Sequence, residues 1–179
     1  MTSIYSSFKV IASICTVLLL TACGGGTAKP SLTAEEGQVF VEPTEAPPQA
    51  TGGFDNPVIT PDKVSYTLSS PSHFTPGKFA SGHLPGQLNE KFTVSISNNS
   101  AAELDLATLI VKGNTAAGEC VDIFDGDTIM EGAPTEPLAM GASTTFGWGL
   151  SCPGKAGDEF SVTLSNAGVN FVEVKGKLA

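Results

Sequence analysis

Apolar and polar side chains alternate along four stretches of the chain after residue 60. These stretches cover residues 64–69, 92–97, 146–152 and 160–165. A period of two puts apolar side chains on one face of an extended strand and Ser, Thr or Gly on the other. Each stretch therefore predicts a β-strand with one face against a core and the other toward water.

Three less regular apolar runs bring the number of expected strands to about seven. They lie at residues 104–112, 120–124 and 169–175, and Gly, Pro and Asn-rich turns separate them. Such a series of short strands without a helical segment is typical of a β-sandwich. The sequence thus predicts an all-β, antiparallel, immunoglobulin-like β-sandwich over residues 61–179, with a small antiparallel barrel as the alternative.

Residues 23–60 have a different composition and no hydrophobic period. They contain five Pro, six Gly and five acidic residues against one Lys. A stretch of this kind buries too little apolar surface to offset the entropy of ordering it. We expect a disordered tether, which as a flexible coil would span roughly 35 Å. Its one apolar cluster is Val39-Phe40-Val41.

The N-terminus carries an apolar run, residues 10–22, that is too short to cross a bilayer. Its 13 residues would form a helix of about 20 Å, against a hydrocarbon core of roughly 30 Å. Its length suits the core of a signal peptide over residues 1–22. The alternatives are an ordinary secretory signal and an uncleaved anchor.

The run ends in Leu20-Thr21-Ala22-Cys23, which resembles the lipobox of bacterial lipoproteins. The resemblance implies cleavage before Cys23 and a diacylglyceryl group on its thiol. Stable attachment requires two or more acyl chains. The expected location is the cell membrane, with the domain lipid-anchored and facing outward.

Two of the four cysteines remain for the folded domain. Cys15 leaves with the signal peptide and Cys23 takes the lipid, so that Cys120 and Cys152 remain. An even pair in an oxidising compartment predicts a disulfide. A reactive or metal-binding thiol pair is the alternative, but the sequence has no Cys-x-x-Cys and no nearby His.

Several short motifs resemble, in their order, Ig-like domains of actinobacterial lipoproteins and secreted antigens. They are the strand end Phe92 to Asn98 with its polar turn, Ile123-Phe-Asp-Gly126, Pro137-Leu-Ala-Met-Gly141 and the closing run Val172 to Leu178. The likeness covers about residues 61–179. It implies a β-sandwich and brings no established activity or catalytic residues.

Charge and motif content argue against several functions. The net charge is −9 and every basic residue is Lys, which argues against the basic face that binding to nucleic acid or anionic lipid requires. No nucleophile elbow or phosphate loop occurs, and the histidines are two, His73 and His83. We expect a protein that is not an enzyme and has no cofactor.

Two segments remain as candidate sites. Asp122, Asp125 and Asp127 are a weak candidate for binding Ca²⁺, and the alternative is an acidic hairpin that faces water. Residues 71–88 are long for a loop and carry four candidate partner contacts, His73, Phe74, Phe79 and His83. In the alternative interpretation, Phe74 and Leu84 plug one end of the sandwich and the rest of the loop covers an edge strand.

The sequence therefore favours a membrane-anchored exported lipoprotein whose non-catalytic domain binds an unknown protein or cell-envelope component. The second hypothesis is an envelope hydrolase or small-ligand receptor with its site near residues 71–88. A deep apolar pocket beside His73 or His83 would favour this second hypothesis.

Overall fold

The computed structural model describes residues 46–179. The signal peptide, Cys23 and most of the predicted tether lie outside the described residues. The described chain forms eleven strands and one 3-10 turn: β1 (Ala50–Gly53), β2 (Val58–Ile59), β3 (Val64–Leu68), β4 (Ser72–His73), β5 (Leu88–Asn98), β6 (Leu109–Thr115), β7 (Gly118–Glu119), β8 (Val121–Ile123), η1 (Gly126–Thr128), β9 (Ser143–Cys152), β10 (Glu159–Asn166) and β11 (Val169–Lys177).

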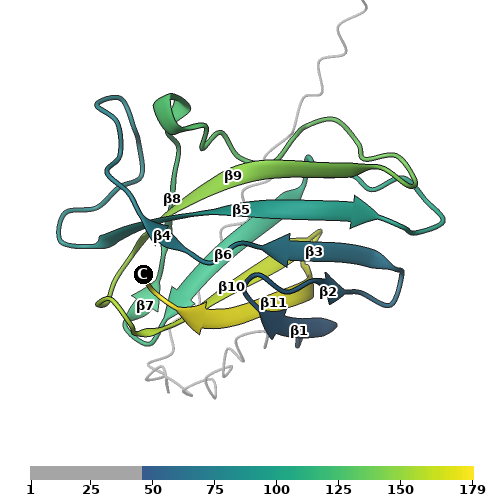
Figure 1. Ribbon diagram of the computed structural model, residues 1–179, viewed down its shortest axis with the longest axis horizontal. Helices are drawn as coiled ribbons and strands as arrows, with labels where there is room; N and C mark the ends of the chain where they lie inside the picture. Colours follow the sequence, from purple (N-terminus) through teal and green to yellow (C-terminus); the bar gives the residue numbers. More distant parts are fainter. Residues whose placement is uncertain (1–45) are drawn as a thin grey trace, which may run out of the picture. The chain divides into compact units, whose positions relative to one another are not determined.

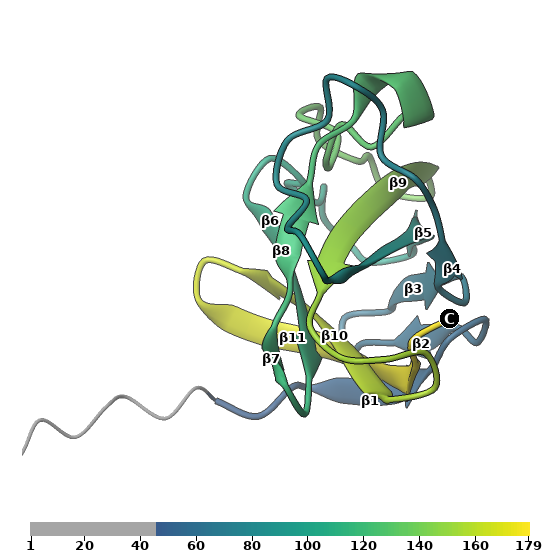
Figure 2. The ribbon, with the colours of Figure 1, turned by 90° about the vertical axis from the view of Figure 1, so that its left-hand side faces the viewer.

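These strands form two sheets that pack face to face (Figures 1 and 2). The first sheet has the order β1-β11-β10-β6-β7, and the second has the order β2-β3-β5-β9-β8 with β4 added alongside β5. Every pairing is antiparallel except that of β1 with β11. The predicted all-β sandwich is confirmed.

Each of the seven predicted stretches contributes a strand, although the run at residues 104–112 does so only from Leu109 onward. The four additional strands, β1, β2, β4 and β7, have two to four residues each. A strand of two residues has too few positions to show a period, so the alternation pattern could not find these elements.

The folded domain begins earlier than residue 61, because β1 and β2 lie within the stretch predicted as tether. Residues Ala50–Gly53 pair with Val172–Lys175 of β11. Gly52 lies so close to β2 that an added Cβ would be 2.4 Å from Val58 Cγ2. Residues 50–53 are thus held by their parallel pairing with β11 and by the close approach that Gly52 allows. Neither feature produces a hydrophobic period in the sequence.

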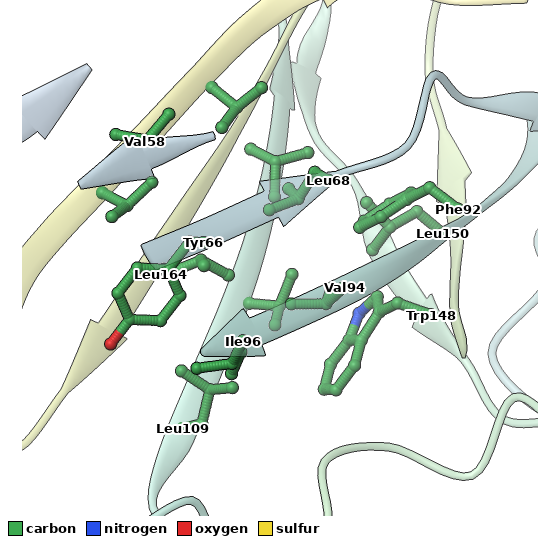
Figure 3. Packing of buried hydrophobic residues seen from close by; sticks show 14 of the residues in the cluster. Val58, Tyr66, Leu68, Phe92, Val94, Ile96, Leu109, Trp148, Leu150 and Leu164 are labelled. Atoms are coloured by element: carbon green, nitrogen blue, oxygen red, sulfur yellow. The ribbon is translucent and has the colours of Figure 1, made fainter. Parts of the chain in front are cut away.

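The core lies between the sheets and is built from the apolar positions of the alternating stretches (Figure 3). Val94 and Ile96 of β5, Leu150 of β9 and Leu164 of β10 have no exposed surface. Phe54 stacks on Phe160 with ring centroids 5.7 Å apart. Burial of such side chains contributes roughly 1.5–3 kcal/mol each and is the main stabilising term of the fold.

The predicted disulfide is present and closes the core at one end. Cys120, where the chain passes from β7 to β8, is bonded to Cys152 at the end of β9, with Cα atoms 4.3 Å apart. The bridge therefore ties the crossing between the two sheets to a central strand. Among residues 46–179, no helix has the length and apolar character needed to cross a membrane.

Candidate binding surface

The alternation of residues 146–152 suggested that the outer face of β9 is open to water. This face instead packs against a second apolar cluster. Gly147 and Gly149 alternate with the inward-facing Trp148 and Leu150. A Cβ added at Gly147 would lie 3.0 Å from Met130 Cε. A Cβ added at Gly149 would lie 3.2 Å from Ile123 Cβ and 3.4 Å from Phe74 Cζ. Phe74, Ile123 and Met130 are all buried. The glycines make the room that these side chains fill.

Ile123 of β8 and two loops carry this cluster. We name the loops the strap (residues 74–87) and the acidic loop (residues 124–132). Ser81 and Phe124 exchange backbone hydrogen bonds of 2.9 and 3.0 Å, so the two loops are paired. Figures 1 and 2 both show them side by side at one end of the sandwich. The strap is also fixed to β9, because the Leu84 N–H donates to Ser151 Oγ at 3.0 Å.

The strap lies along the free edge of β8. Gly82 has a φ of +88°, and an added Cβ would lie 1.8 Å from the Asp122 carbonyl oxygen. Only glycine fits such a close approach in this left-handed conformation. The strap therefore protects an edge strand, which is the arrangement that the edge-covering interpretation of residues 71–88 expects.

Asp125 is the polar link between the two loops. Its carboxylate accepts the Gly77 N–H at 2.8 Å and the Asp127 N–H at 3.1 Å. The side chain is 3% exposed. The hydrogen bond from Gly77 lowers the pKa of Asp125, outweighing the effect of burial. Asp125 therefore holds the strap in place as an ionised acceptor.

The three aspartates considered for Ca²⁺ do not converge on one point. Asp122 belongs to β8 and accepts the indole Nε1–H of Trp148 at 2.9 Å. Burial raises its pKa. Asp125 instead binds the strap, and Asp127 is exposed on the acidic loop. Within the described range, no three His, Cys, Asp or Glu side chains gather in a way that would hold a metal ion.

The two histidines lie apart from any catalytic arrangement. His73 is exposed on β4 opposite Glu90 of β5, and His83 is exposed on the strap. Neither imidazole makes a hydrogen bond with another of the described residues. Neither histidine lines the two larger hollows described on the domain surface. One, of about 500 Å³, includes Asp62 and Asn99, and the other, of about 380 Å³, includes Ile129 and Glu131 of the acidic loop.

Glu90, beside His73, is a buried carboxylate that the sequence analysis did not single out. It has no exposed surface, and neither of its carboxylate oxygens makes a hydrogen bond within the described part of the chain. Burial raises its pKa, and the charge of His73 opposes that shift.

The paired loops present apolar side chains to solvent. Phe79 is 84% exposed and Ile129 is 74% exposed, while Phe124 and Leu84 are about half exposed. We name these four side chains the paired-loop surface. Of the four predicted contacts, His73, Phe79 and His83 are accessible, whereas Phe74 is buried against Gly149 of β9 and anchors the start of the strap.

Ile129 has a backbone conformation that is unusual for its type. Its φ is 60° and its ψ is 40°, in the left-handed region, at the end of η1. A β-branched residue there is strained, by about 1–3 kcal/mol. The surrounding loop sustains this strain although the large apolar side chain is in solvent and contributes nothing to the core. No sequence period marks this position, so the sequence analysis missed it.

Comparison with known proteins extends the fold assignment without adding an activity. No protein-family model matches the chain, and no curated protein sequence matches it. The secreted protein MPT63 of Mycobacterium tuberculosis has a similar structure, with a TM-score of 0.51 and 14% identity over 70% of this chain and 96% of MPT63. A candidate lipoprotein of Bacillus subtilis, YcdA, aligns with a TM-score of 0.50 and 12% identity, over 74% of this chain and 39% of YcdA. The shared property is the β-sandwich fold.

Proposed function

We propose that this protein is an exported lipoprotein, anchored through Cys23, whose β-sandwich binds a protein or cell-envelope component with the paired-loop surface. The observation that carries the proposal is the exposure of Phe79 and Ile129 on loops that Asp125 and the Ser81–Phe124 pairing hold in place. Exposed apolar groups on a rigid support are typical of interaction sites.

The direction of the strands places the paired loops and the start of the described chain at opposite ends of the sandwich. The strap leads into the start of β5, which pairs with the end of β9. The chain enters the domain at the other end, where the Ala46 carbonyl accepts the Asn170 side-chain N–H near the start of β11.

A non-catalytic role fits the same residues. Among residues 46–179, neither histidine has a hydrogen-bonded partner, so no hydroxyl or thiol is paired with an imidazole. The hydroxyls that do contact a carboxylate, Ser70 on Asp55 and Thr60 on Asp62, have no histidine beside them. General acid–base chemistry requires such contacts, at about 2.6–3.2 Å. The fold alone supplies no activity.

Site-specific photo-cross-linking in intact cells tests the proposal. A photoreactive side chain at position 79 or 129 should give one discrete adduct with a partner. The same group at Ile59 or Met140, which are 63% and 62% exposed elsewhere on the domain, should not. Equal adducts at all four positions, or none at 79 and 129, would refute the binding surface. Release of the Cys23→Ser protein from membranes tests the anchor separately.

A further inference from the structure

The charges of the paired loops are mainly acidic. The acidic loop contains three acidic residues and no Lys or Arg, and the strap contains one Lys, Lys78. Asp127 and Glu131 of the acidic loop are exposed on either side of Ile129. Neither carboxylate is in an ion pair with another described residue. Both are therefore available to a partner.

The nearest basic side chain on the strap is already engaged. Lys78 lies over the ring of Phe79, with Nζ 5.4 Å from the ring centroid. The positive charge of Lys78 is therefore directed to the ring of Phe79 and not to the two carboxylates. Asp127 and Glu131 thus favour a basic ligand group.

We propose that the partner presents a cationic, apolar peptide segment to the paired-loop surface. Aliphatic side chains of the segment would contact Phe79, Phe124 and Ile129, and its Lys or Arg side chains would approach Asp127 and Glu131. Charge complementarity of this kind selects the partner and accelerates its association. A second copy of this chain is disfavoured as the occupant, because two surfaces with the same acidic residues would repel each other.

This inference rests on the proposed function, since it specifies the chemistry of the partner at the same surface. The full-length lipoprotein in phosphatidylcholine nanodiscs would be bound to an array of 12-residue Leu-rich peptides. The peptides would have equal hydropathy and net charges from −4 to +4. Empty nanodiscs provide the blank. Binding should increase with positive charge and decrease as the salt concentration rises.

Two pairs of substitutions separate charge from apolar contact. Asp127→Asn with Glu131→Gln should weaken binding of the +4 peptide about fivefold, because exposed ion pairs are individually weak. The matched control is Glu103→Gln with Glu136→Gln, which removes the same number of charges at exposed sites outside the paired loops. This control should leave binding of the +4 peptide unchanged. Phe79→Ser with Ile129→Ser should abolish binding.

The outcomes distinguish the two proposals. Binding that requires Phe79 and Ile129 but is independent of peptide charge would overturn the cationic partner and leave the binding surface intact. Binding that increases with negative charge would also overturn it. Binding that neither loop variant reduces would overturn both proposals.

Discussion

The two faces of β9 show how one strand serves two different purposes. Its inner face carries Trp148, Leu150 and Cys152, which fill the space between the sheets and fix the disulfide. Its outer face carries Gly147, Gly149 and Ser151, which hold the strap and the acidic loop. The inner face supports the fold through large side chains. The outer face supports the candidate binding surface through small ones.

The difference teaches that a small-residue face of a strand is not necessarily a solvent face. Where Ser and Thr line the outer face, as at Ser95 and Thr145, their hydroxyls pair with each other at 2.8 Å and remain exposed. Where Gly lines it, backbone and apolar side chains from loops approach to contact distance. The predictions below separate the contributions of the two faces.

The largest loss of stability should come from a change at the inner face of β9. Replacing both Cys120 and Cys152 by Ser opens a loop of 32 residues, which should destabilise the domain by about 3–4 kcal/mol in the chain-entropy model. Urea unfolding of the oxidised protein and of the double variant measures the difference. An unchanged midpoint would show that the bridge does not stabilise this fold.

An intermediate effect is expected from Gly147→Ala on the outer face. The new Cβ would lie 2.7 Å from the Ile129 carbonyl oxygen, so the acidic loop must move outward, at a cost of about 1–3 kcal/mol. Amide exchange should accelerate in residues 124–132 and remain slow in β5 and β10. Gly53→Ala is the control, because its Cβ would meet nothing closer than 3.8 Å. Exchange that accelerates uniformly would contradict a local effect.

The sequence was a good guide to the inner face and a poor one to the outer face. Alternation identified Val94, Leu150 and Val162 as core positions, because burial between two sheets requires a period of two. It could not reveal that Phe74 and Met130, which lie in loops, pack on the glycines of β9. The Phe74 contact depends on the fold, which joins segments 75 residues apart, and the Met130 contact depends on a loop that turns back onto β9. Their one sequence signal is the Gly alternation around Trp148.

A smaller effect should follow from Asp125→Asn, which weakens the link between the strap and the acidic loop. Loss of the ionised acceptor should raise amide exchange at Gly77 roughly tenfold, since a charged acceptor strengthens the bond. The pKa of Asp125 is lowered in the fold. Its stabilisation is therefore present above the unfolded pKa and is lost as pH falls through the folded pKa.

Measuring the exchange at Gly77 as a function of pH checks this interpretation. After correction for intrinsic exchange, protection in the wild-type protein should fall in acid, whereas the Asn variant should show no such transition. Protection that is equal in both proteins would contradict the role of Asp125. The core residues of β5 provide the reference, because their exchange depends on global unfolding.

The smallest effect should come from Glu90 on the buried face of β5. Its substitution should stabilise the domain, whereas the changes above destabilise it. Glu90 is buried without hydrogen bonds to its carboxylate oxygens, and its pKa is raised, so the fold favours the protonated form. Its ionised form therefore destabilises the domain at neutral pH, and this penalty is relieved as pH falls through the folded pKa. Glu90→Gln should stabilise the domain by about 1 kcal/mol at pH 7 and by less in acid. Thermal unfolding of both proteins from pH 7 into acid measures the difference in stability. A Gln variant that is less stable than the wild type at pH 7 would mean that His73 compensates the charge of Glu90.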